Sequence, residues 1–131
     1  MLDIFAEYAT DEALENEGTW VPFGSASLRI GRTGNRKYVK LLTAAVEANK
    51  MVLDQKTPEA EALSDKIMID TLAEAVLFDW KLLAYKKEPL PYTKDNARLL
   101  LGHKDFRREV VKLADDMGRF CANMEAEQEK N

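Results

Sequence analysis

The fold is decided by residues 59–83, EAEALSDKIMIDTLAEAVLFDWKLL. Thr57 and Pro58, just before this stretch, are typical of a helix N-cap and of a first helical position. The apolar residues that follow cover far more than a third of a helical circumference, which a helix on the protein surface would not tolerate. We therefore predict one long helix from Glu59 to about Leu83 at the centre of the fold.

Three further helices are predicted around the central one. Residues 35–54, 93–101 and 106–124 carry apolar side chains at helical spacing. The first two stretches begin with Asn35 and Thr93, residue types that favour the N-cap position. In the last stretch the apolar residues recur every three or four positions, which predicts a heptad-like seam.

A β-hairpin is predicted within residues 18–33, where two short β-prone runs flank Gly24. Pro22 has no N–H group to donate, so its strand should lie at the edge of the sheet. The acidic residues 1–17 allow one or two short helices. The expected fold class is therefore mainly α, a compact helical domain of about four to five helices with a small N-terminal β-hairpin.

Composition limits the domain organisation and the class of protein. The 131 residues, of which 46% are hydrophobic and 32% charged, predict a single folded domain over residues 1–131 with a polar tail at 125–131. The single cysteine, Cys121, excludes an internal disulfide and favours a reducing cytoplasm. The N-terminus has no signal-peptide pattern, and the most apolar region is too short and too acidic to span a membrane.

Charge is distributed unevenly along the chain. Residues 1–17 contain six acids and no base. Residues 18–46 contain no acid and five bases, which are Arg29, Arg32, Arg36, Lys37 and Lys40. The two segments could neutralise each other within one chain, or they could join copies head to tail through complementary patches.

Catalytic and metal-binding patterns are weak. The chain has one histidine, His103, and no zinc, EF-hand or phosphate-loop motif, so no metal or cofactor is expected. Asp70 and Glu74 are most simply the one strip of the central helix that faces water, since they stand four positions apart. Enzymatic activity is therefore not expected.

Several short motifs occur in an order that points to a known family. They are residues 17–21, 28–38, 77–80 and 89–93 with Asn96, and then Phe106, Val110, Ala114, Met117 and Phe120. In this order the chain resembles the tail assembly chaperones of long-tailed bacteriophages over nearly its whole length. It departs from them at residues 81–87, which lack the expected glycine-rich turn.

The resemblance implies a non-enzymatic helical protein of the host cytoplasm that coats the tape measure protein before the tail tube polymerises. It also implies self-association, no nucleic acid or membrane partner, and a longer frameshifted product that recruits the tail tube protein. A groove lined by Met68, Met117 and Met124 could adapt to many helical segments. The expected interaction residues are the five bases named above, Met117 and Met124.

Two other functions remain open from the sequence. The basic segment 29–40 could serve a small nucleic-acid-binding regulator, and Asp70, Glu74 and His103 could serve a small enzyme. The last residues, Glu129-Lys130-Asn131, can be encoded as GAA AAA AAC, which contains a slippery heptamer and would permit the frameshift at this point.

Overall fold

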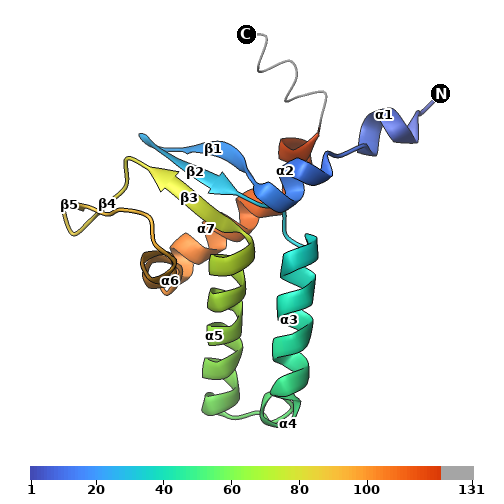
Figure 1. Ribbon diagram of the computed structural model, residues 1–131. Coiled ribbons are helices and arrows are strands. Elements are labelled where there is room, and N and C mark those ends of the chain that lie inside the picture. The colour runs from blue at the N-terminus through green and yellow to red at the C-terminus, as the bar shows by residue number, and fades with distance from the viewer. Residues whose placement is uncertain (122–131) are drawn as a thin grey trace.

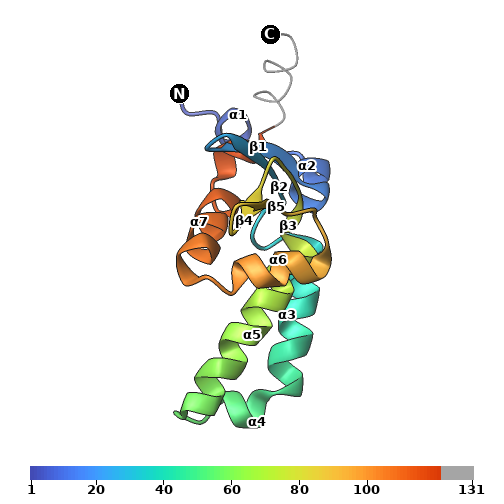
Figure 2. The same ribbon diagram turned by 90° about the vertical axis from the view of Figure 1, so that its left-hand side faces the viewer.

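The computed structural model describes residues 1–121, which form a mixed α/β fold (Figures 1 and 2). Its elements in chain order are α1 (Ile4–Tyr8), α2 (Glu12–Glu17), β1 (Thr19–Phe23), β2 (Ala26–Ile30), α3 (Arg36–Ala48), α4 (Lys50–Leu53), α5 (Pro58–Ala75), β3 (Leu77–Lys81), β4 (Ala84–Tyr85), β5 (Glu88–Pro89), α6 (Lys94–Leu101), α7 (Lys104–Ala114) and the 3-10 helix η1 (Met117–Phe120). The predicted class, a mainly α domain with one hairpin, was wrong. The strands form a three-stranded and a two-stranded antiparallel sheet, although helices hold more residues than strands do.

The larger sheet has the strand order β1-β2-β3. Strands β1 and β2 form the predicted hairpin, with Thr19 opposite Ile30 and Phe23 opposite Ala26. Pro22 lies on β1, which is an edge strand as expected. Gly24 has φ 61° in the turn, a conformation that glycine adopts without strain.

Strand β3 replaces the last part of the predicted central helix. Helix α5 begins as predicted, because Thr57 accepts a hydrogen bond from the backbone N–H of Ala60 and Pro58 is the first helical residue. It ends at Ala75 and not at Leu83. Residues 77–81 pair instead with β2, whose second edge would otherwise leave backbone donors and acceptors unpaired. An apolar run predicts burial equally well for a helix and for a strand.

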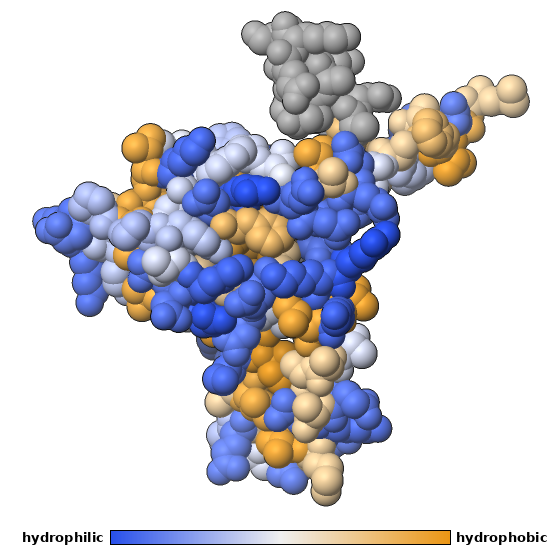
Figure 3. All heavy atoms as spheres, in the orientation of Figure 1, coloured by the Kyte–Doolittle hydropathy of each residue, from blue (hydrophilic) through white to orange (hydrophobic). Residues whose placement is uncertain are grey.

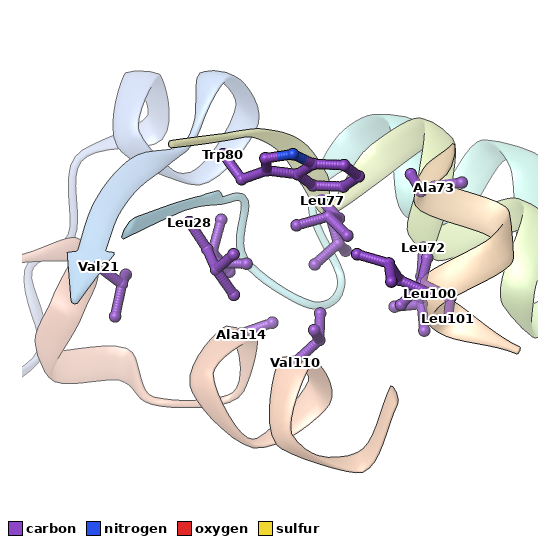
Figure 4. Packing of buried hydrophobic residues seen from close by; sticks show 13 residues of the cluster. Val21, Leu28, Leu72, Ala73, Leu77, Trp80, Leu100, Leu101, Val110 and Ala114 are labelled. Atoms are coloured by element: carbon purple, nitrogen blue, oxygen red, sulfur yellow. The ribbon is translucent and has the colours of Figure 1, made fainter. Parts of the chain in front are cut away.

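The hydrophobic core lies between the larger sheet and the helices α5, α6 and α7 (Figure 4). Leu28 of β2 and Leu77 of β3 are fully buried together with Leu72 of α5 and Val110 of α7. Trp80 is 5% exposed and was expected in a helical core, but it lies on β3. Its indole N–H donates a hydrogen bond of 2.7 Å to the carbonyl of Leu90, and its ring meets Tyr92 edge to face.

Helices α3 and α5 are antiparallel and project from the rest of the molecule as a two-helix stalk, closed at its tip by α4 (Figure 1). Asn35 caps α3, as predicted, by accepting a hydrogen bond from the backbone N–H of Tyr38. Helix α3 ends at Ala48, earlier than the predicted Asp54, and no residue of α3 is buried. The stalk therefore exposes much of its surface.

The C-terminal part of the described chain contains α6 and α7. Thr93 caps α6 as predicted. Helix α7 ends at Ala114, whereas the sequence predicted a helix that continues to Met124. The Asp116 side chain instead accepts a hydrogen bond from the backbone N–H of Gly118, which starts η1 and lets Phe120 fold into the core. Met124 and the predicted polar tail 125–131 lie outside the described residues.

Candidate functional site

The basic segment of residues 29–40 does not form one free cationic face. Arg32 and Arg36 form ion pairs with Glu15 and Glu12 of α2, with N–O distances of 3.6 and 3.5 Å. The acidic and basic segments thus contact each other within one chain, at least through α2.

The remaining bases of this segment lie in different surroundings. The Arg29 guanidinium lies 5.9 Å from the centre of the Phe78 ring, and Lys37 pairs with Glu74 of α5 at 3.6 Å. Lys40 is exposed on α3. A nucleic acid would therefore have to compete with internal acids for three of the five bases.

Asp70 and Glu74 belong to a charged cluster between α5 and α6. The guanidinium of Arg98 donates to both carboxylates at 3.1 Å, and Lys94 pairs with Glu74 at 3.5 Å. Partial burial alone would lower the pKa of Arg98, but the hydrogen bond and charge of Asp70 and the charge of Glu74 raise it above its ordinary value. The two carboxylates are thus held by cations, and their partner Arg98 was not foreseen from the sequence.

His103 is not part of this cluster. Its Nε2 atom lies 2.9 Å from the hydroxyl of Tyr85 on β4. The three residues considered for an enzyme are therefore divided between two places, with Asp70 and Glu74 on α5 and His103 before α7. Within residues 1–121, no group of His, Cys, Asp and Glu side chains is arranged to hold a metal ion.

A first groove runs along the stalk between α3 and α5. Its cavity has a volume of about 300 Å³, and we call it the stalk groove. The apolar lining consists of Leu41, Ala45, Leu63 and Ile67, and the polar lining of Asn49, Lys66, Asp70, Thr71 and Glu74. Figure 3 shows apolar side chains gathered along this part of the stalk. Charged side chains border an apolar strip here, an arrangement that suits the apolar face of a helix.

A second groove of about 320 Å³ lies between the stalk and α7, and we call it the basic groove. Tyr38, Met68 and Val111 supply its apolar floor, and Lys104, Arg107 and Arg108 supply its cations. Burial, followed by the charge of Asp115, raises the pKa of Tyr38. The Tyr38 hydroxyl therefore stays protonated at neutral pH and donates to the Met68 sulfur at 3.9 Å.

Two of the three methionines of the expected groove lie on different elements of the fold. Met68 lies in the basic groove, whereas Met117 lies in η1, where its carbonyl accepts a hydrogen bond from the Cys121 thiol. Met124 is outside the described residues.

Of the residues predicted as the apolar side of the helix at 35–54, Tyr38, Ala45 and Asn49 line the grooves beside α5, whereas Val52 is exposed on α4. The spacing could not show that a gap remains between α3 and α5.

Comparison with known proteins gives one family. Residues 33–131 match the model of a family described as YdaY prophage protein. Neither the curated proteins nor the solved structures contain a match to this chain. None of the helices that the structure describes has the length and apolar character needed to cross a membrane.

Proposed function

Since the chain belongs to the YdaY prophage protein family, we propose that it is a phage tail assembly chaperone that binds the tape measure protein in the host cytoplasm. The observation that carries the proposal is the stalk groove, an apolar strip between two exposed helices with charged side chains at its border. The role is one of binding, without a chemical reaction.

The chemistry of the groove suits the tape measure protein as its occupant. That protein, by the resemblance of this chain to tail assembly chaperones, is a long and largely helical chain with apolar stripes. Such stripes promote aggregation until the tail tube covers them. If a helix of that protein places its apolar stripe on Leu41, Ala45 and Leu63, the groove covers the stripe as the tail tube later does and protects the helix from aggregation.

The shallow form of the site supports reversible binding. The three side chains are only partly buried in the free protein, so the groove offers modest apolar area. Binding of modest affinity at many similar segments would coat a long chain and still allow release to the assembling tube.

The proposal includes two further parts. Copies of the chain associate with one another, and a longer frameshifted product carries an extra domain that recruits the tail tube protein. The proposed slip site at Glu129-Lys130-Asn131 lies outside the described residues. Reading the gene tests this part: a GAG codon for Glu129, an AAG codon for Lys130, or the absence of an overlapping −1 frame would exclude it.

Co-expression tests the proposed function. The tape measure protein of the same prophage should be mostly insoluble alone, and should become soluble and co-purify with this chain when both are expressed. A tape measure protein that stays insoluble, or that is soluble and does not bind, would contradict the proposal.

The alternative of a nucleic-acid-binding regulator is tested in parallel. Titration of labelled DNA and RNA at low and high salt would show binding that weakens steeply with salt if the alternative is correct. We expect no such binding, because Arg32, Arg36 and Lys37 are paired with acids of the same chain.

A further inference from the structure

The N-terminal helix α1 exposes an unusual amount of apolar surface. Leu2, Ile4, Phe5 and Tyr8 are 68%, 60%, 80% and 58% exposed, and no residue of α1 is buried. Figures 1 and 3 show α1 projecting from the body with its apolar side chains in the open. A cluster of large apolar side chains on a projecting segment is typical of a protein–protein contact.

The length of α1 leads to the same expectation. A helix of five residues has too few backbone hydrogen bonds to be stable by itself in water. The Asp3 side chain caps it by accepting a hydrogen bond from the N–H of Phe5, but a cap stabilises a helix only modestly. Helix α1 should therefore gain most of its stability when its apolar side chains rest on another surface.

The charges in the two grooves indicate which of them suits α1. Residues 1–8 carry Asp3 and Glu7 and no basic side chain. The stalk groove contains Asp70 and Glu74, and the cation of its lining, Lys66, is already paired with Asp70. The basic groove combines an apolar floor with three cations: Arg107 pairs with Asp65 and Arg108 with the exposed Asp105, whereas Lys104 forms no ion pair within the described residues. Lys104 and the apolar floor therefore complement α1 in charge and in apolar surface.

The short tether of α1 favours a groove on another molecule. Only Ala9 and Thr10 separate α1 from Asp11, whose N–H is bonded to the carbonyl of Phe120 at 2.8 Å. Two extended residues span about 7 Å. The cations of the basic groove lie in the first half of α7, and α7 is about 15 Å long and ends before Phe120. The groove of the same chain is thus out of easy reach.

We propose that α1 of one copy binds in the basic groove of a second copy. The apolar side chains of α1 cover Tyr38, Met68 and Val111, and Glu7 lies beside Lys104. This inference rests on the self-association included in the proposed function and identifies its interface. Its test contains no tape measure protein, so the failure of one proposal is distinguishable from the failure of the other.

Two variants of the full chain test the interface. Ile4→Ser with Phe5→Ser removes apolar surface from α1, and Lys104→Glu with Arg108→Glu reverses charge at the groove. All four side chains are exposed, so both variants should fold like the wild type by circular dichroism. Sedimentation equilibrium should show self-association of the wild type and at least a tenfold weaker association of each variant.

Matched controls and a mixing experiment complete the test. Met51→Ser removes an equally exposed apolar side chain, and Lys87→Glu reverses an exposed charge outside the groove, so both should associate like the wild type. A mixture of the two interface variants should form a one-to-one heterodimer, because one supplies an intact groove and the other an intact α1. A monomeric wild type, unimpaired interface variants, or a mixture that stays monomeric would overturn the proposal.

Discussion

The side-chain amide of Asn35 donates a hydrogen bond of 2.8 Å to the carbonyl of Ala75. This contact joins the start of α3 to the end of α5, across forty positions of sequence. Asn35 is 3% exposed, and the same side chain also donates to the carbonyl of Arg32 and caps α3 at Tyr38. One buried amide thus fixes the base of the stalk and the relative position of the two helices that line the stalk groove.

Replacing Asn35 with Ala should destabilise the protein by about 2–4 kcal/mol. The variant loses an N-cap, which contributes about 0.5–2 kcal/mol, and leaves the Ala75 carbonyl short of a partner in a buried place. Chemical denaturation measures this change. Asn16→Ala is the control, since Asn16 accepts only an exposed hydrogen bond from the N–H of Arg36. Equal stability of the two variants would contradict this role of Asn35.

Gly31→Ala should destabilise the protein by about 1–3 kcal/mol, because the site has no room for a methyl group. A Cβ atom on Gly31 would lie 2.6 Å from the Phe78 ring and 3.0 Å from the carbonyl of Ala75. Gly34→Asn is the comparison: Gly34 has φ 85°, which asparagine tolerates, and has open space around it. Thermal unfolding of the two variants should therefore differ clearly, and similar melting temperatures would contradict the close packing of Gly31 against Phe78.

Removing Arg98 should cost about 1–2 kcal/mol of stability. Arg98 links α6 to Asp70 and Glu74 of α5, but all three side chains are about one-third to two-fifths exposed, so each pair contributes at most about 1 kcal/mol. A double-mutant cycle of Arg98→Ala with Asp70→Asn measures the coupling. The coupling should shrink in 1 M salt, and a salt-independent value would contradict an electrostatic origin.

Local sequence signals predicted much of the secondary structure. Asn35, Thr57 and Thr93 each cap a helix at the expected position, because the capping hydrogen bond depends only on residues three positions apart. The hairpin of β1 and β2 was predicted for the same reason, since Gly24 and the β-prone runs on both sides are neighbours in sequence.

Features that depend on distant contacts were missed. The run Leu77 to Trp80 is apolar in either a helix or a strand, and only the free edge of β2, some fifty residues earlier, decides for a strand. Likewise, the apolar spacing after Ala114 continued the helical pattern, but the side chain of Asp116 and the burial of Phe120 end it.

The two grooves also could not be predicted from the sequence. Leu41 and Leu63 stand on different helices, and the space between them depends on how α3 and α5 are set apart at the stalk. The bases of α7 could not be placed beside Met68 without the packing of α7 against the stalk. The sequence showed that the N-terminal region has an acidic and a basic half. It did not show that α2 forms ion pairs with bases of the same chain while α1 stays exposed.

The most direct test of the central claim compares two neighbouring positions on α3. Ala45 lines the stalk groove, whereas Ala44 is exposed beside it. Ala45→Glu and Ala44→Glu add the same charge and the same side chain to the same helix, so they differ only in whether the groove is blocked. Both variants should retain the circular dichroism spectrum of the wild type.

The measurement is the dissociation constant of each variant for a short, soluble helical segment of the tape measure protein of the same prophage, by titration of labelled chain with that segment. We predict that Ala45→Glu weakens binding at least tenfold, which corresponds to about 1.4 kcal/mol, and that Ala44→Glu stays within twofold of the wild type. Equal affinities of the two variants, or no binding by the wild type, would contradict the stalk groove as the site that binds the tape measure protein.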